Sequence, residues 1–371
     1  MIKNWSPELD GLRGYASLWV LLGHICILTQ CHIPILSNPG FGVDLFILLS
    51  GFLMAKNYIE RMQADPWESS NTIKSFWVRR FFRIAPLYYF MLIFAFLLGE
   101  HIGYYRDVIA SVWPNTQTET SRYTDASFNN IFMHVTFFFG LHPTYAFRTA
   151  LPDWSIGLEM QYYALFPFIM LLAKKFGFAK ISIISMCLCI LINYLLPDYF
   201  SKFSMPSMIA FKLPLFISGM LIYKASMEKQ LSYSIIAMMA PMLTLFSGYF
   251  ISNFQFIIDE LMILGLSVLM TQIKTPSIEK LKNPLAKFLS FKTNQVLGEL
   301  SYSAYLLHLL IVIPIIGLLI RHTEFENYNG MMRFIISTTI ILPLTYILSW
   351  ILSTFIEKPG ISFGKKCIKK K

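Results

Sequence analysis

The residues best suited to chemistry are an arginine and a histidine in the first apolar segment, residues 9–28. Arg13 and His24 stand eleven positions apart, which at about 100° per residue brings them within about 20° of one helix face, with a rise of roughly 16 Å between them. Ionisable groups inside a bilayer are rare and usually functional. A cation could hold an anionic substrate while an imidazole, with an ordinary pKa of about 6.5, moves a proton. The pair therefore indicates a site that binds an anion and moves a proton.

Both residues also have an ordinary structural interpretation. His24 could be satisfied by a neighbouring helix or a bound water. Arg13 could anchor the helix by pairing with Asp10 or Glu8. The sequence alone leaves these alternatives open.

The segment 40–52 carries two further polar residues inside an apolar stretch. Its glycines predict a close approach to a neighbouring helix. Asp44 cannot face lipid as a bare anion, so it must pair with a cation, titrate or line a cavity, and pairing with an arginine is the structural alternative. Ser50 lies on the same predicted helix.

Arginines cluster before the third apolar segment. Arg80 and Arg83 are three residues apart and share a predicted helix face, with Arg79 beside them. Anchoring at the membrane boundary is one interpretation. A phosphate site is equally well formed, because guanidinium groups bind phosphate in a bidentate manner.

The segment 152–167 begins with a helix-start signature, in which Asp153 is a predicted cap. Glu159 and Gln161 follow one to two turns into the predicted helix. A carboxylate at that depth needs a use or a partner.

A polar stripe is predicted late in the chain. Ser301, Tyr305 and His308 follow one another at spacings of four and three, so they lie on one helix face, which we expect to face the bundle interior. Hydrogen bonding between helices is the structural alternative for Ser301 and His308.

Composition identifies the class of protein that positions these residues. Of the 371 residues, 55% are hydrophobic and 14% are charged. Apolar runs recur from end to end, which predicts an all-α fold, a polytopic membrane helix bundle in one domain, residues 1–360, with a basic tail, 361–371. The five cysteines show no paired spacing, so neither a disulfide nor a metal site is expected. We expect about ten transmembrane helices, at residues 10–31, 40–59, 84–104, 154–173, 180–197, 207–224, 231–251, 255–273, 295–320 and 333–356.

Basic residues predict the orientation of these helices. Ten crossings put both chain ends on one side, and 24 of the 31 Lys and Arg residues fall on that side. The positive-inside rule then places both termini in the cytoplasm. The formal net charge of +10 is therefore a topology signal and does not indicate nucleic-acid binding.

One apolar stretch, residues 131–141, is too short to cross a bilayer. We expect a re-entrant segment near 131–143, which is tolerated where it is buried in protein or lines a wet cavity. Its flanks carry the largest polar collection away from the terminal side: His101, Asp107, Glu119, Asp125, His134, His142 and Asp153.

These motifs, taken in order over most of the chain, resemble the membrane acyltransferase-3 family. They are Arg13 with His24, Gly42-Val-Asp-Leu-Phe with Ser50-Gly-Phe-Leu, the segment 79–86, Trp154-Ser through Glu159 to Pro167, Ser301-Tyr to His308, and Glu357-Lys-Pro. The resemblance implies a ten-helix protein of the bacterial cytoplasmic (inner) membrane that moves an acyl group, commonly acetyl, from cytoplasmic acyl-CoA to a hydroxyl. Met160 stands where the family usually has a second glutamate, which argues against a mechanism that needs a carboxylate pair.

The resemblance also implies roles for the site residues. We expect His24 to act as the general base on the acceptor hydroxyl, Glu159 to share in catalysis, and Arg13 to line one channel with His24. The phosphates and pantetheine arm of acetyl-CoA, the donor substrate, would be bound by Arg13, Arg79, Arg80 and Arg83. The acceptor would be bound or supported by Asp44, Ser50, Trp154, Ser155, Tyr162, Ser301, Tyr305 and His308. A route through an acyl-His24 or acyl-Ser50 intermediate is the alternative.

The acceptor expected from the resemblance is a cell-surface glycan, such as lipopolysaccharide O-antigen or exopolysaccharide, or a lipid-linked sugar. No permanently bound cofactor, metal or nucleic acid is expected, and membrane lipid surrounds the protein. No esterase-like domain follows the predicted membrane domain in this sequence, so we expect the membrane domain itself to complete the transfer. A secondary transporter of a small anionic or sugar-linked substrate is the alternative, although no matching halves are visible. A non-enzymatic scaffold leaves four intramembrane ionisable residues unexplained.

Overall fold

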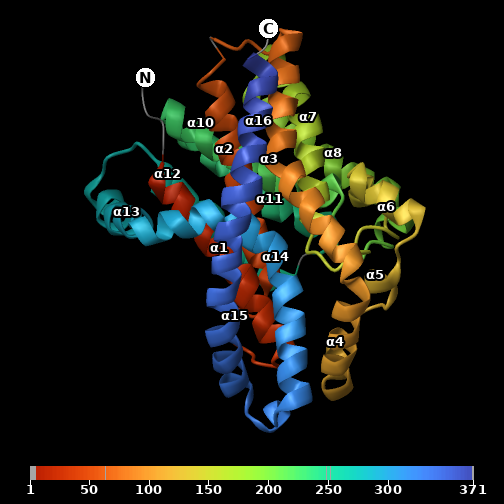
Figure 1. The fold of residues 1–371 in the computed structure, drawn as a ribbon. Coiled ribbons are helices and arrows are strands. Elements are labelled where there is room, and N and C mark those ends of the chain that lie inside the picture. The colour runs from red at the N-terminus through yellow and green to blue at the C-terminus, as the bar shows by residue number, and fades with distance from the viewer. Residues whose placement is uncertain (1–5, 63, 248, 251, 370–371) are drawn as a thin grey trace.

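The computed structural model describes residues 6–62, 64–247, 249–250 and 252–369, and these residues form helices and connections without a strand (Figure 1). Short 3₁₀ turns lie at Pro114–Thr116, Phe138–Leu141 (η2) and Phe325–Asn327, and a π turn (η4) lies at Ser353–Glu357. The helices are α1 (Pro7–Leu28), α2 (Pro39–Ile59), α3 (Ser70–Leu97), α4 (Gly99–Val112), α5 (Ser121–Thr124), α6 (Phe128–Val135), α7 (Trp154–Phe176), α8 (Phe178–Leu195), α9 (Pro197–Phe200), α10 (Ile209–Glu228), α11 (Leu231–Ser247), α12 (Asn253–Met270), α13 (Pro276–Leu289), α14 (Lys292–His322), α15 (Gly330–Leu352) and α16 (Lys358–Lys369).

Within the described residues, nine helices are long and apolar enough to cross a membrane. The predicted all-α, multi-pass architecture is therefore confirmed. The remaining predicted span, 231–251, corresponds to α11, which is apolar but has only 17 residues. Positions 248 and 251 of that span lie outside the described residues. The nine are α1, α2, α3, α7, α8, α10, α12, α14 and the continuous helix that runs from α15 through η4 into α16.

Successive connections alternate between the two ends of the bundle (Figure 1). The connections from α1 to α2 and from α14 to α15 lie at the lower end, together with the tip of α4. The connection from α2 to α3 and the end of α16 lie at the upper end. This alternation is what a multi-pass chain requires.

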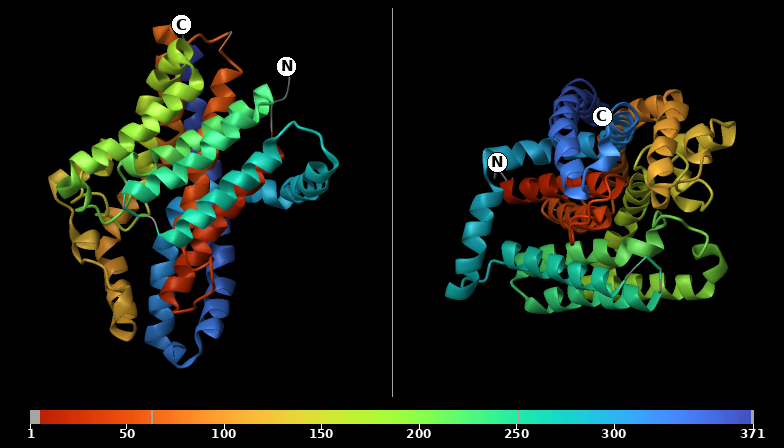
Figure 2. Two further views of the ribbon diagram at one scale, coloured as in Figure 1. Left: turned by 180° about the vertical axis from the view of Figure 1, so that it is seen from behind. Right: turned by 90° about the horizontal axis from the view of Figure 1, so that it is seen from below.

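Helix α1 lies inside the bundle and packs against α14 and α2 (Figure 2). Gly14 and Gly298 make the contact with α14 possible, because a side chain on Gly298 would collide with the backbone oxygen of Asp10. Gly51 and Gly219 play the same part between α2 and α10. The close approach predicted from the glycines of 40–52 is confirmed.

The segment predicted to be re-entrant forms two short elements, α6 and η2. They are separated by Phe137, whose φ of 61° lies in the left-handed region, so no continuous helix forms here. His134 and Asn130 on α6 are fully buried. Neither element is long enough to cross a bilayer.

The basic tail continues the last helix in the structure. Residues 358–369 form α16, which packs on α3 through Gly360 and Gly364, against Pro86 and Phe82. The last two lysines of the tail, Lys370 and Lys371, lie outside the described residues.

Candidate active site

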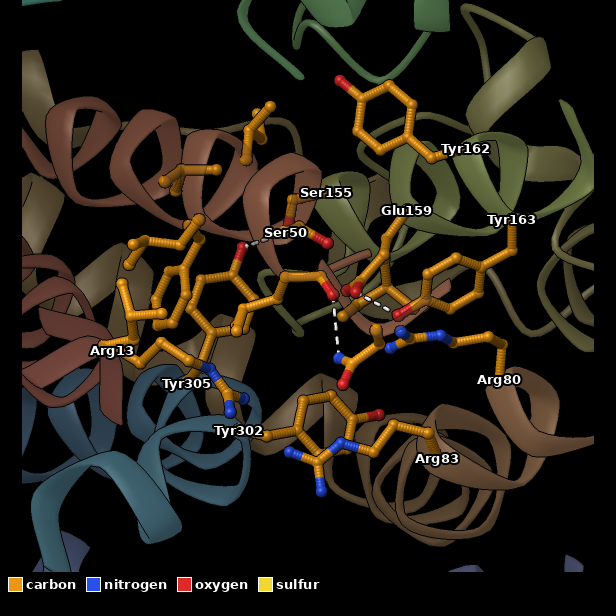
Figure 3. A pocket seen from close by; sticks show the side chains of 18 of the residues that line it. Arg13, Ser50, Arg80, Arg83, Ser155, Glu159, Tyr162, Tyr163, Tyr302 and Tyr305 are labelled. Atoms are coloured by element: carbon orange, nitrogen blue, oxygen red, sulfur yellow. Dashed lines mark hydrogen bonds between the residues drawn. The ribbon is translucent and has the colours of Figure 1, made fainter. Parts of the chain in front are cut away.

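A cavity of about 400 Å³, here called the Arg13 cavity, lies among α1, α2, α3, α7 and α14. Arg13, Arg80 and Arg83 line it, and their guanidinium groups point towards its middle (Figure 3). Ser6, Lys56 and Asn57 line its mouth near the start of α1 and the end of α2. A further cavity of about 500 Å³ shares Asp10, Arg13 and Arg83 with it and adds Lys292 and Lys358.

Two of the three arginines are held in different ways. Arg80 lies over the rings of Tyr58 and Tyr163, at 5.6 and 5.4 Å from the ring centroids, and its Nε has no hydrogen-bond partner. Arg83 pairs with Glu357 of η4 at 3.1 Å. Arg80 therefore keeps donor capacity for an anion, whereas Arg83 is oriented by a carboxylate.

Arg79 does not share this placement. It is half-buried on α3 but lines none of the cavities found among the described residues. One helix step of about 100° separates Arg79 from Arg80, so the two side chains leave α3 in different directions. The grouping of Arg79 with Arg80 and Arg83 is therefore corrected, because only the latter two reach the cavity.

Glu159, Ser50 and Tyr162 also line the Arg13 cavity. Tyr163 donates a hydrogen bond to Oε1 of Glu159 from one turn along α7. Tyr162 is buried and stacks on Phe216, and its hydroxyl has no partner. Glu159 and Asp10 supply the carboxylates of this otherwise cationic cavity.

A second cavity, of about 670 Å³, lies on the other side of the bundle centre and is here called the His24 cavity. His24 lines it together with Asp44 and Trp154. The other charged residues in its wall are Arg106, Arg122 and Lys212.

Asp44 is buried and forms an ion pair. The sequence suggests an arginine as the partner, but the structure has a lysine. The Asp44 carboxylate lies 2.8 Å from Nζ of Lys212 on α10 and accepts a hydrogen bond from Gln255 on α12. Gln255 also donates to Asp259 at 3.2 Å. This network ties α2, α10 and α12 together at the wall of the His24 cavity.

The hydrogen bonds around His24 fix which of its nitrogens can act as a base. Nδ1 of His308 lies 2.6 Å from the carbonyl oxygen of Tyr305, which can only accept, so this nitrogen carries the proton. In the neutral ring, Nε2 of His308 is then an acceptor, and it lies 3.2 Å from Nδ1 of His24. Nδ1 of His24 also lies 2.9 Å from the carbonyl oxygen of Val20. His24 Nδ1 is therefore the donor, and its Nε2 keeps a free lone pair.

Two residues stand where the two cavities meet. Val43 and Tyr305 line both of them. The hydroxyl of Tyr305 donates to the carbonyl oxygen of Pro152 at 2.6 Å and lies 2.7 Å from Oγ of Ser155 (Figure 3). The single channel expected for Arg13 and His24 corresponds to two adjoining cavities: the two residues share one helix, and each lines one of the cavities.

The late polar stripe faces the interior as predicted. Ser301 and His308 have no exposed surface and Tyr305 is 6% exposed. Ser301 donates to the carbonyl oxygen of Gly298 and lines no cavity among the described residues, which is the structural alternative. His308 reaches the site through His24.

Several charged residues of the three cavities were not predicted as site residues, among them Arg106, Arg122 and Lys212 of the His24 cavity and Glu357 of the adjoining cavity. The first three were counted only as charges on the far side of the membrane, and their burial depends on which helices close over them. Glu357 had a usable signal, because Glu357-Lys-Pro was one of the six motifs. No three His, Cys, Asp or Glu side chains are grouped for a metal in the described part of the chain.

Comparison with known proteins decides the family. A family model described as an acyltransferase domain matches residues 6–354, nearly the whole chain. The chain belongs to the acyltransferase-3 family. It is therefore a multi-pass membrane acyltransferase domain, and both cavities lie inside the matched region.

The curated relatives extend beyond this domain. The chain is 25% identical over 349 residues to the O-acetyltransferase OatA of Staphylococcus aureus, an alignment that covers 84% of this chain and 51% of the relative. It is 27% identical over 181 residues to the peptidoglycan O-acetyltransferase OatA of Listeria monocytogenes, covering 47% of this chain and 25% of the relative. The chain thus spans about half the length of the Staphylococcus aureus relative and a quarter of the Listeria monocytogenes relative. No solved structure matches it.

Proposed function

We propose that this acyltransferase moves an acetyl group from cytoplasmic acetyl-CoA to a hydroxyl of a sugar. One observation carries the proposal: two cavities meet at Tyr305, one lined by three arginines and the other by a histidine with a free Nε2. This geometry suits a reaction between two substrates that enter from opposite sides of a membrane. The relatives reported above are O-acetyltransferases, which agrees with it.

The Arg13 cavity would take the donor. Coenzyme A carries several phosphates, which suit the guanidinium groups of Arg13 and Arg80. The adjoining cavity with Lys292 and Lys358 offers two more cations for the nucleotide end. The pantetheine arm would then run past Glu159 towards Tyr305, a distance comparable to the roughly 16 Å rise from Arg13 to His24.

The His24 cavity would take the acceptor. In direct transfer, Nε2 of His24 accepts the proton of the sugar hydroxyl while that oxygen attacks the thioester carbonyl carbon. The tetrahedral intermediate then collapses, the carbon–sulfur bond breaks, and the imidazolium returns its proton to the leaving thiolate. A general base of this kind contributes on the order of 10² to 10⁴ in rate.

Glu159 lines the donor cavity and not the His24 cavity. We therefore place it beside the donor arm, where Tyr163 fixes its orientation. The alternative route through an acyl-enzyme would use Ser50, which also faces the donor cavity. Mass spectrometry of protein incubated with acetyl-CoA alone would distinguish them, because only the second route leaves an acetylated residue.

The orientation and the acceptor are part of the proposal. The distribution of Lys and Arg supports cytoplasmic termini in a bacterial inner membrane, which would place the mouth of the Arg13 cavity in the cytoplasm. The His24 cavity would then open outwards, where a surface polysaccharide, lipopolysaccharide or lipid-linked sugar is assembled.

The test is release of free thiol from acetyl-CoA by the purified protein with an acceptor glycan. We expect His24→Ala to reduce this release at least 100-fold while the protein still inserts and unfolds cooperatively. His322→Ala, at the exposed end of α14, is the matched control and should behave like the wild type. Full activity of His24→Ala would remove His24 from the mechanism. A transporter would move labelled substrate without releasing thiol.

A further inference from the structure

The His24 cavity contains two buried arginines that face no carboxylate in an ion pair. Arg106 on α4 is 9% exposed and Arg122 on α5 is 5% exposed. Neither takes part in any ion pair found among the described residues. Nε of Arg106 and Nη2 of Arg122 have no hydrogen-bond partner. A buried guanidinium normally has a carboxylate or phosphate beside it, so this pair needs an explanation.

Arg122 is held in a fixed position with one edge free. Its Nε donates to the carbonyl oxygen of Thr149 at 2.9 Å. Its guanidinium carbon lies 3.6 Å from the ring centroid of Phe147, so the planar group stacks on that ring. Arg122 and Phe147 both line the cavity. Nη2, which has no partner, is therefore held on a rigid support in the cavity wall.

The charges in the cavity wall do not balance. Arg106, Arg122 and Lys212 are cationic, and of the described residues in the wall only Asp44 carries a carboxylate, which Lys212 already neutralises. Burial lowers the pKa of Arg106, Tyr123 raises it, the like charge of Arg122 lowers it, and Asp107 raises it. Burial also lowers the pKa of Arg122, and Asp153, which does not line the cavity, raises it. A bound anion would offset the repulsion between the two arginines.

We propose that the His24 cavity holds its acceptor through an oxyanion, a carboxylate or a phosphate, bound by Arg106 and Arg122. This inference rests on the proposed function, in which that cavity takes the acceptor sugar. The acceptor would then be an acidic or phosphorylated sugar. Both arginines line the same cavity as His24. A bound anion would therefore reduce their repulsion of the imidazolium that forms when His24 accepts a proton.

The experiment measures binding of three small probes to the purified protein in detergent at constant ionic strength. Glucuronate supplies a carboxylate, glucose 1-phosphate supplies a phosphate, and glucose is the neutral comparison. The variants are Arg106→Gln, Arg122→Gln and Arg122→Lys. Arg321→Gln is the matched control, because Arg321 is an exposed cation at the end of α14 that lines none of the cavities. The readouts are calorimetric affinity and the shift in Tm.

We expect at least one anionic probe to bind and raise the Tm, and glucose to do neither. Removing either guanidinium should weaken binding of the anion roughly tenfold or more, since hydrogen bonds to charged groups contribute about 1.5 to 3 kcal/mol. Arg122→Lys should retain part of the affinity, and Arg321→Gln all of it. Whichever anion binds more tightly identifies carboxylate or phosphate as the acceptor group.

Two results would overturn the inference: anions that bind no better than glucose, or anions that bind Arg106→Gln and Arg122→Lys as tightly as the wild type. Arg106→Gln and Arg122→Lys keep the test decisive if Arg122→Gln does not fold. No acetyl-CoA is present, so the result is independent of transfer. If thiol is released only with a neutral acceptor, the proposed function holds and the oxyanion site is wrong. If the anions bind but no thiol is released with any acceptor, the oxyanion site holds and the proposed function is wrong.

Discussion

Nε2 of His308 lies 3.2 Å from Nδ1 of His24, and this contact joins α14 to α1 at the centre of the bundle. Because Nδ1 of His308 is committed to the carbonyl oxygen of Tyr305, the contact directs the proton of His24 to its Nδ1 side. The opposite nitrogen of His24 is left as a base in the His24 cavity. His308 itself lines no cavity found in the described structure, so its proposed role is to position His24.

The first prediction concerns this positioning. We expect His308→Leu to lower kcat for acetyl transfer roughly tenfold with little change in either KM, since the base loses orientation while the binding surfaces remain. His308→Gln, whose side-chain oxygen can accept from Nδ1 of His24, should recover much of the loss. Steady-state kinetics of thiol release checks both variants. Equal damage by leucine and glutamine would assign His308 to packing alone.

The second prediction concerns the donor arginines. Acetyl-pantetheine lacks the phosphates of acetyl-CoA, so the wild type should have a lower KM for acetyl-CoA. We expect Arg13→Gln or Arg80→Gln to raise the KM for acetyl-CoA about tenfold or more and to leave that for acetyl-pantetheine nearly unchanged. Arg79→Gln is the control on the same helix and should keep the wild-type preference. A uniform loss with both donors would argue against phosphate binding.

Much of the arrangement was predictable because it follows from local periodicity. The shared face of Arg13 and His24 and the buried stripe from Ser301 to His308 depend only on helix geometry and on the avoidance of lipid by polar groups. The glycine contacts of α2 were equally predictable. These features can be predicted without knowing which helices pack against one another, provided that the helices form a bundle.

The arrangement as two adjoining cavities was not predictable, because it depends on contacts between distant segments. Val43 of α2 and Tyr305 of α14 line both cavities, and Tyr305 is fixed there by Pro152, which precedes α7, and by Ser155 at the start of α7. The lysine that neutralises Asp44, Lys212, lies near the start of the predicted span 207–224, where the sequence predicts only a charge on the far side of the membrane. Likewise, nothing local distinguishes a buried Arg122 from a charge at the surface.

The third prediction concerns the glycine contact that brings the two histidines together. A methyl group on Gly298 would collide with the backbone of Asp10, which cannot move aside as a side chain can. We expect Gly298→Ala to destabilise the protein by about 1 to 3 kcal/mol and to lower transfer activity. Gly265→Ala on α12 is the control, since its new methyl would meet nothing within 4 Å, and alanine there should be neutral or slightly stabilising. Thermal unfolding in detergent measures both; a Tm for Gly298→Ala equal to the wild type would show that α1 and α14 can separate freely.

The fourth prediction concerns pH and the loop between α5 and α6. Burial raises the pKa of Asp125, but hydrogen bonds from Ser127 and Arg148 outweigh it and hold the pKa below the ordinary value. A carboxyl with a lowered folded-state pKa stabilises the protein above its unfolded pKa of about 3.9, and this stabilisation is lost as the pH falls through the folded-state pKa.

We therefore expect Asp125→Asn to have a lower Tm than the wild type from pH 8 to pH 5. The difference should shrink below about pH 4. Asp65→Asn is the control, because Asp65 and Arg61 form an exposed pair at 3.9 Å, which contributes little at any pH. A Tm difference for Asp125→Asn that grew as the pH fell would reverse the assigned sign.

The fifth prediction concerns Tyr305, which lines both cavities. Its hydroxyl is fixed by Pro152 and Ser155, so Tyr305→Phe frees the ring and leaves the carbonyl oxygen of Pro152 without its donor. We expect this variant to hydrolyse acetyl-CoA in the absence of acceptor several-fold faster than the wild type, because water from the His24 cavity then reaches the thioester. Ser155→Ala removes only one of the two hydrogen bonds and should have a smaller effect. The rate of thiol release in the absence of acceptor measures this hydrolysis. If Tyr305→Phe hydrolysed acetyl-CoA no faster than the wild type, the Tyr305 hydroxyl would have no part in excluding water. Val43 and the surrounding packing would then have to exclude it.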